Sequence, residues 1–232
     1  MPDSTLYPNI SSNPDRTTRS DTRPLLSLAG RRLCEIRPGS AIQEAVVRFI
    51  QSRFLEAYGA RPSLRVPQLL ALLNRQDNVS AAVGVRDARV ERLFLEDYLE
   101  NPIEEALPDD ASIDRAGVFE IAHLAGVEPG ISRFLFPMLT VWLTEHRARW
   151  IAFTGTAQLR NSFDRLGIET HVVGPAKAER LPDRGIGWGR YYEHGPMVMV
   201  ANVPSGYAAL TRVGLLDHIQ SLEDGGCYEL TA

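Results

Sequence analysis

Cysteine and long apolar runs are scarce in this sequence. The chain of 232 residues has two cysteines, Cys34 and Cys227, which are too few for a disulfide framework and leave a single bridge between them open. No apolar run reaches the roughly 18 residues that a membrane-spanning helix needs. The N-terminus lacks a charged and then apolar signal pattern, so we expect a cytoplasmic protein without an integral membrane segment.

An excess of positive charge and the short motifs of several enzyme classes are also missing. The net charge of −4 does not suggest a nucleic-acid partner. The sequence contains no HExxH, CxxC, P-loop or GxSxG motif, which argues against a zinc site, an NTPase and a serine hydrolase, and we expect no metal. Neither cysteine has a nearby pattern of His or Asp, so a thiol nucleophile is not indicated.

Linker-like sequence is confined to the N-terminus. Residues 1–24 are rich in Ser, Thr, Asn, Asp, Pro and Arg, and such a stretch buries too little apolar surface to offset its ordering entropy. No Gly/Ser-rich or Pro-rich linker interrupts the chain after about residue 30. We therefore expect a flexible tail over residues 1–30 and a single domain over residues 31–232.

Apolar and amphipathic segments alternate in the centre of the chain. Residues 116–125 and 150–156 are apolar runs and predict strands. Between them, the apolar residues of 131–146 recur at i, i+3, i+4 and i+7, which predicts a helix. Proline disfavours a helix interior, so we place the helix start near 131–134, with Pro137 in the first turn. Strands that alternate with helices of this length favour parallel pairing.

Further elements are predicted on both sides of this centre. Ser40 and Gln43 form the pattern of a capping box at the start of a helix. The other expected elements are a strand at 33–36, a hairpin of 68–73 and 79–86, short helices at 93–100 and 102–107, a helix at 157–167, strands at 171–174 and 197–203, and a terminal helix at 208–219. This order predicts an α/β fold with a mixed sheet, antiparallel at one end and parallel at the centre, and helices on both faces.

Short segments spread over about residues 55 to 203 carry a resemblance to a known family. They include AVGVRDA at 82–88, FEIAHLA at 119–125 and WGRYY at 188–192, and the others are 93–99, 102–104, 153–156, 159–161 and 163–167. Together they resemble the thermostable haemolysin family of bacterial proteins, which implies a GNAT-like acyltransferase fold. The resemblance would make residues 116–125 the strand that forms the floor of the acyl-donor site.

The part from Glu120 to Gly167 is similar in layout to acyl-homoserine-lactone synthases, which transfer acyl groups from a carrier protein to an amine. The resemblance therefore implies an N-acyltransferase of biosynthesis. Its donor would be an acyl thioester of phosphopantetheine, on acyl carrier protein or as acyl-coenzyme A, and its acceptor a small-molecule amine such as an amino acid. Two other interpretations stay open: a membrane-active or lipid-interacting protein, as the family name suggests, and a GNAT-like ligand-binding domain without catalysis.

Two residues of the 116–125 strand are candidates for a catalytic base. Glu120 lies between Phe119 and Ile121, where burial should raise the pKa of a carboxylate as a general base requires. It can equally face solvent or pair with an arginine. His123 is the second candidate, although regular strand alternation puts it on the face opposite Glu120 and a β-bulge would be needed to realign the two. The family usually has Asn at this position.

The loop before the 131–146 helix is the candidate phosphate site. A GNAT phosphate loop reads Arg/Gln-x-x-Gly-x-Gly/Ala, and the nearest match is VEPGIS at 127–132. Gly130 and Ser132 suit close backbone approach, Ser132 can cap the helix, and Arg133 can contact a phosphate. The leading cation or amide is missing and Glu128 adds a negative charge, so we expect a carrier-protein thioester to be preferred over coenzyme A.

Other candidate residues are predicted around the same site. Thr154 ends the second central strand, at the usual edge for a site in a parallel sheet. Arg160 and Asn161 lie near the start of the next helix, and either can meet a carboxylate or the pantetheine amides, with Asn161 the candidate for contact with the cofactor. Arg86 can bind an acceptor carboxylate in bidentate fashion. Trp188 and Tyr191 are expected to line an acyl tunnel, unless they belong simply to the core.

Overall fold

The computed structural model describes residues 21–64, 67–108 and 114–222. These residues form a sheet with the strand order β7-β8-β6-β5-β4-β3-β2-β1-β9. The strands are β1 (Thr22–Leu28), β2 (Arg31–Ile36), β3 (Gln68–Leu73), β4 (Val79–Asp87), β5 (Val118–Gly126), β6 (Trp150–Gly155), β7 (His171–Pro175), β8 (Met197–Asn202) and β9 (Gln220–Ser221). Among the described strands β5 and β6 run parallel and the other pairs are antiparallel, which confirms the predicted mixed sheet.

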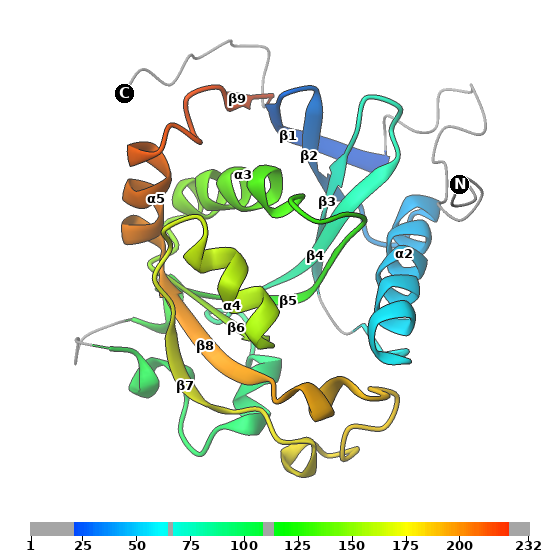
Figure 1. Cartoon of the computed structure of the whole chain (residues 1–232), viewed down its shortest axis with the longest axis vertical. Coiled ribbons are helices and arrows are strands. Elements are labelled where there is room, and N and C mark those ends of the chain that lie inside the picture. Colours follow the sequence, from blue (N-terminus) through cyan, green and yellow to red (C-terminus); the bar gives the residue numbers. More distant parts are fainter. Residues whose placement is uncertain (1–20, 65–66, 109–113, 223–232) are drawn as a thin grey trace.

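Helices cover both faces of the sheet, as predicted (Figure 1). Helix α2 (Ala41–Tyr58) packs its apolar face against β4 and β5, on the side of the sheet that also holds Trp188 and Tyr191. The other face is covered by α3 (Ser132–Glu145), α4 (Ala157–Asp164) and α5 (Val203–Arg212). The hydrophobic core is therefore divided by the sheet into separate layers.

Strands β5 and β6 separate before either of them ends. Their parallel pairing runs from Val118 opposite Trp150 to Ile121 opposite Phe153 and then stops. Beyond that point β5 pairs only with β4, and β6 pairs only with β8. Each strand therefore turns one unpaired edge towards the gap between them, where backbone N–H and C=O groups are available to a ligand.

A β-bulge lies in β5 where the two strands separate. Ala122 is opposite Gly84, but the next pair is Ala125 opposite Ala82, so two residues of β5 face one residue of β4. His123 is in the bulge and has a φ of 54°, which is rare outside glycine. The bulge that would be needed to realign Glu120 and His123 is therefore present, and it interrupts the alternation that would have sent them to opposite faces.

Several expected boundaries are wrong. The tail predicted over residues 1–30 overlaps β1, in which Leu25 and Leu26 are buried because the strand pairs with β2; residues 1–20 lie outside the described residues. Strand β7 is antiparallel at a sheet edge, because β8 is inserted between it and β6. Pro137 lies in the second turn of α3, not the first.

The remaining differences concern helices. The two short helices after β4 are 3-10 helices, η1 (Phe94–Tyr98) and η2 (Ile103–Ala106). The last helix begins at Val203, directly after β8, where Asn202 caps it by accepting a hydrogen bond from the Ser205 N–H. The capping residue of α2 is Ser40, as predicted, and its hydroxyl accepts from the Gln43 N–H.

Candidate active site

A cleft of about 1090 Å³ opens where β5 and β6 separate. Its walls come from both faces of the sheet: α2 and the η1 segment on one side, and the loop before α3 together with α4 on the other. Most of the predicted site residues line it, namely Glu120, His123, Gly130, Ser132, Arg133, Thr154, Asn161, Trp188 and Tyr191. Arg86 and Arg160 do not.

The helical period of α4 explains why Asn161 lines the cleft and Arg160 does not. Gln158, Asn161, Ser162 and Arg165 line the cleft, and they recur at the i, i+3, i+4 and i+7 spacing of one helix face. Arg160 lies off that face and is exposed to solvent. Gln158 and Arg165 were not predicted, although the same helical period, extended from Asn161, leads to both.

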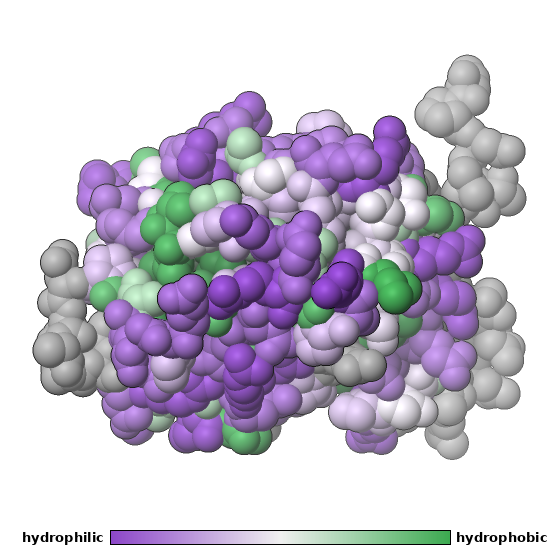
Figure 2. All heavy atoms as spheres, turned by 90° about the horizontal axis from the view of Figure 1, so that it is seen from below, coloured by the Kyte–Doolittle hydropathy of each residue, from purple (hydrophilic) through white to green (hydrophobic). Residues whose placement is uncertain are grey.

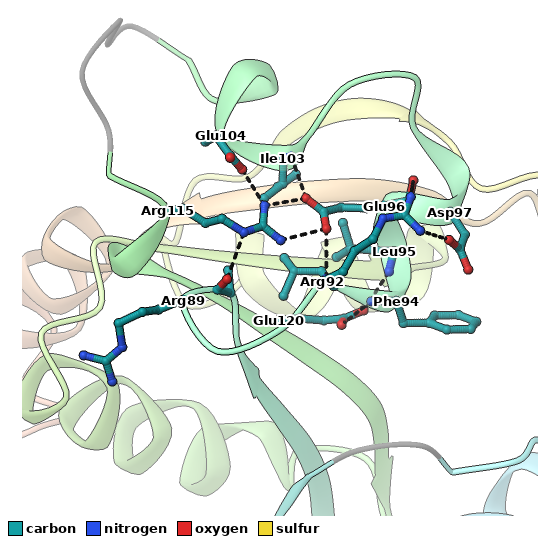
Figure 3. Close-up of polar contacts among 12 residues, drawn as sticks. Arg89, Arg92, Phe94, Leu95, Glu96, Asp97, Ile103, Glu104, Arg115 and Glu120 are labelled. Carbon is teal, nitrogen blue, oxygen red and sulfur yellow. Dashed lines mark hydrogen bonds and ion pairs between the residues drawn. The ribbon is translucent and has the colours of Figure 1, made fainter.

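Glu120 is held by three hydrogen-bond donors. Its carboxylate accepts bonds from Arg86 Nη1 at 2.9 Å, from the Phe94 N–H at 2.9 Å and from the Leu95 N–H at 3.0 Å (Figure 3 draws the two backbone bonds). The residue is 2% exposed. Burial raises the pKa of Glu120, and the positive charge of Arg86 and the two N–H donors oppose this rise.

Arg86 does not present its guanidinium to the cleft. It is 6% exposed, bonded to Glu120, and its Nε lies 3.4 Å from a carboxylate oxygen of Glu91. The predicted role as a bidentate anchor for an acceptor carboxylate is therefore wrong, because the guanidinium is occupied by carboxylates of the chain itself. The cross-strand pairing of Arg86 with Glu120 in the antiparallel β4–β5 ladder is what brings these two side chains together.

A second buried carboxylate holds the segment that follows β4. Glu96 accepts bonds from the backbone N–H groups of Leu93 and Ile103 and from Arg115, which also bonds Glu104 (Figure 3). Burial alone would raise the pKa of Glu96, but these donors outweigh burial and lower it. Residues 93–107 are thus held at two points: Glu96 pairs with Arg115, which precedes β5, and Glu120 of β5 accepts bonds from η1.

His123 is the cleft histidine, and the bulge turns it towards the aromatic side of the site. Its ring stacks on Trp188, with centroids 5.9 Å apart, and meets the ring of Phe54 edge-on at 6.2 Å. Burial lowers the pKa of His123 to about 4, with a smaller effect from the charge of Arg86, so the ring is neutral at pH 7. Its Nδ1 is buried and has no hydrogen-bond partner among the described residues.

The loop of residues 127–132 and the start of α3 form the polar end of the cleft. Gly130 has a φ of 88°, a conformation that glycine adopts without strain. Ser132 is the first residue of α3 and does not cap it, and no side chain caps this helix start. The N–H groups of Arg133, Phe134 and Leu135 already donate to the carbonyls of Gly130 and Ile131, so the attraction of this helix start for an anion comes mainly from the helix dipole. Glu128, whose charge opposes an anion, lies 3.6 Å from Arg31 and is partly neutralised by it.

Fold and site together define a GNAT-like protein: a mixed sheet whose central parallel strands separate over a cleft, with an uncapped helix start at one end. The chain belongs to the thermostable hemolysin family, which matches residues 36–207. None of the curated proteins matches this sequence.

Solved structures with the same fold include an N-acyl amino acid synthase, TofI and an AHL synthase. FeeM, an N-acyl amino acid synthase from uncultured soil microbes, is 14% identical with a TM-score of 0.54, over 84% of this chain and 100% of FeeM. The apo form of TofI is 14% identical with a TM-score of 0.53, over 82% of this chain and 96% of TofI. The AHL synthase LasI is 12% identical with a TM-score of 0.52, over 81% of this chain and 95% of LasI.

Proposed function

We propose that the protein is an N-acyltransferase that moves an acyl group from a phosphopantetheine thioester to a small-molecule primary amine. The observation that carries this proposal is the separation of β5 from β6 beyond Ile121 and Phe153, directly over the cleft. An extended pantetheine arm contains amides, and two unpaired strand edges offer the backbone groups that amides bind. All the predicted site residues except Arg86 and Arg160 line the same cleft.

The polar end of the cleft suits the phosphate of the arm. The start of α3 supplies the positive end of a helix dipole, and Arg133 and Arg165 are among the residues that line the cleft. One phosphate, as on acyl carrier protein, fits the single helix start. We therefore keep carrier protein as the preferred donor, and coenzyme A as the alternative, because residues 127–132 lack a cation.

A small apolar pocket of about 40 Å³ adjoins the cleft on the α3 side and suits the first carbons of an acyl chain. Leu124, Leu139, Leu143, Leu159 and Phe163 are among its lining residues. It shares Ile121, Phe136 and Thr154 with the cleft, so a thioester carbon near the strand gap can direct its alkyl group there. Burying alkyl carbons is favourable by about 0.8 kcal/mol per methylene.

His123 is our candidate for proton transfer, in place of Glu120. The amine nitrogen attacks the thioester carbon, the C–S bond breaks, and the proton lost by the nitrogen passes through His123 to the departing thiolate. A neutral imidazole can accept that proton, and its low pKa makes the imidazolium a ready donor to the thiolate. Glu120 already accepts three hydrogen bonds, so we assign it to positioning.

The test is a direct search for product. Purified protein is mixed with acyl carrier protein or coenzyme A thioesters of several chain lengths and a panel of primary amines, and N-acyl products are identified by mass spectrometry. His123→Asn tolerates the left-handed backbone and removes the imidazole, so kcat should fall by about a hundredfold or more. If the protein hydrolyses none of the thioesters and acylates none of the amines, the enzyme proposal is rejected in favour of a ligand-binding domain.

A membrane-active role finds less support. No helix of the described ranges is both long and apolar enough to cross a bilayer. Figure 2 shows that hydrophilic residues cover most of the face seen from below, with hydrophobic residues in small separate groups. Such a face offers no continuous apolar surface to lipid. Any lytic effect of the family would then arise from an acylated, surfactant-like product.

A further inference from the structure

The part of the cleft on the α2 side is a chamber of aromatic rings. We call it the aromatic chamber and define it by Phe54, Tyr58, Phe94, Tyr98, Trp188 and Tyr191, all of which line the cleft. The rings contact one another edge-on, tilted or stacked, for example Phe94 on Trp188 at 6.3 Å and Tyr58 on Tyr191 at 5.1 Å. They come from three separate segments: α2, η1, and residues 188–191, where η5 (Tyr191–His194) begins.

Of the three tyrosines of the chamber, Tyr98 and Tyr191 already use their hydroxyl groups, which leaves that of Tyr58. Tyr98 and Tyr192 share a hydrogen bond of 2.7 Å between their hydroxyls, and the Tyr191 hydroxyl donates to the Thr154 carbonyl at 3.4 Å. Burial raises the pKa of Tyr98 and of Tyr191, so both phenols stay neutral. What the chamber offers to a ligand is therefore mainly aromatic faces.

No positive charge of the described residues is available inside the chamber. The cleft is lined by Arg53, Arg133 and Arg165, and the last two belong to α3 and to the end of α4, on the opposite face of the sheet. Arg53 Nε donates to the carbonyl of Gly126 at 3.0 Å and its Nη1 bonds Glu56, which keeps it at the rim beside the phosphate loop. Arg86, behind Glu120, is paired with carboxylates of the chain.

The placement of the donor decides which substrate enters the chamber. If the phosphate lies at the start of α3 and the acyl chain in the apolar pocket beside Leu139 and Leu143, both parts of the donor occupy the α3 face. The amine must then reach the thioester carbon from the other face of the sheet. That face holds His123, stacked on Trp188, and the aromatic chamber.

We infer that the acceptor is a primary amine that carries an aromatic or similarly flat apolar group and no carboxylate. This inference rests on the proposed function. An aromatic group would pack against Trp188 and Phe94, and an ammonium group is attracted to the faces of such rings before it loses its proton. An amino acid with the same side chain would have to bury a carboxylate that meets no free cation, at a large desolvation cost.

The test compares matched amines with and without the carboxylate. Phenethylamine, tyramine and tryptamine are each set against phenylalanine, tyrosine and tryptophan in competition, with product ratios read by mass spectrometry. We expect kcat/KM to favour the amine of each pair by about tenfold or more. Equal or better acylation of the amino acids would overturn the inference and leave the proposed function standing. If Arg53→Gln then abolished that preference, the rim arginine would be the carboxylate anchor.

Binding is measured separately, so that the inference does not depend on turnover. Phenethylamine without donor should quench the fluorescence of Trp188, and the Trp188→Phe variant should lose this response. Trp150→Phe, which removes a tryptophan outside the cleft, is the matched control and should keep it. Quenching by phenethylamine without any product would contradict the proposed function alone. Equal quenching by phenylalanine, or none by any of the three amines, would contradict the inference.

Discussion

Two interpretations of Glu120, as a general base or as a structural partner of Arg86, predict opposite outcomes for its substitution. As a general base, Glu120→Gln would keep its stability and lose activity by about a hundred- to ten-thousandfold in kcat. As the buried partner of Arg86 and the anchor of η1, it contributes first to stability. The three hydrogen bonds to its carboxylate and its 2% exposure support the second interpretation.

The size of the effect follows from what each substitution leaves behind. Glu120→Ala leaves the buried Arg86 without its 2.9 Å partner and two N–H groups of η1 without an acceptor. Breaking a buried pair in this way costs about 3–5 kcal/mol. For a chain of this size that corresponds to a fall of about 6–20 °C in Tm. Glu120→Gln keeps the shape but loses the charge, and about 1.5–3 kcal/mol is expected.

Thermal and urea unfolding of the single variants at Glu120, Glu91 and Arg86 and of the double variant tests this reasoning. Glu91→Ala is the matched control, because Glu91 also contacts Arg86 but is 42% exposed in its side chain, and it should cost at most about 1 kcal/mol. The double variant of Arg86 and Glu120 should be less destabilised than the sum of the single variants, with a coupling of about 0.5–3 kcal/mol. A Glu120→Gln variant with unchanged Tm and a large loss of kcat would refute the structural interpretation and restore the base.

Three further predictions concern other parts of the chain. Burial lowers the pKa of His123 to about 4, so as the pH falls the histidine is protonated in the unfolded chain before it is protonated in the folded one. Wild type should therefore lose about 3 kcal/mol more stability than His123→Asn between about pH 6.5 and pH 4. Leu26→Ala in β1 should destabilise by about 2–5 kcal/mol, since Leu26 is 1% exposed. Acyl carrier protein thioesters should be used better than coenzyme A thioesters, and Glu128→Gln should raise kcat/KM for the coenzyme A donor by about two- to fivefold.

Each of these predictions has a clear contrary result. Parallel pH profiles of unfolding for wild type and His123→Asn would mean that His123 titrates normally. A loss below about 0.5 kcal/mol for Leu26→Ala would support the tail interpretation of residues 22–28. A coenzyme A preference in wild type, or no response to Glu128→Gln, would remove the electrostatic argument about the phosphate loop.

The sequence alone determined most of the central elements. The hairpin of β3 and β4, the strand–helix–strand unit of β5, α3 and β6, and helix α4 all follow from the spacing of apolar residues over a dozen positions or fewer. Such periodicity reflects which face of an element is buried, and neighbours in the chain encode it directly. Asn161 was located by its place in the helix predicted at 157–167, whereas the phosphate loop was predicted from its resemblance to the GNAT loop motif.

The tertiary structure decided what the site residues can do. The sequence offered Glu120 as a base or as the partner of an arginine, and only the register of β4 against β5, with residues 93–107 folded over it, selects Arg86 and η1 as its partners. The aromatic chamber likewise unites α2, η1 and η5, which are far apart in the chain. Desolvation, ion pairing and cavity walls depend on contacts between distant residues, so local patterns could raise these alternatives without choosing between them.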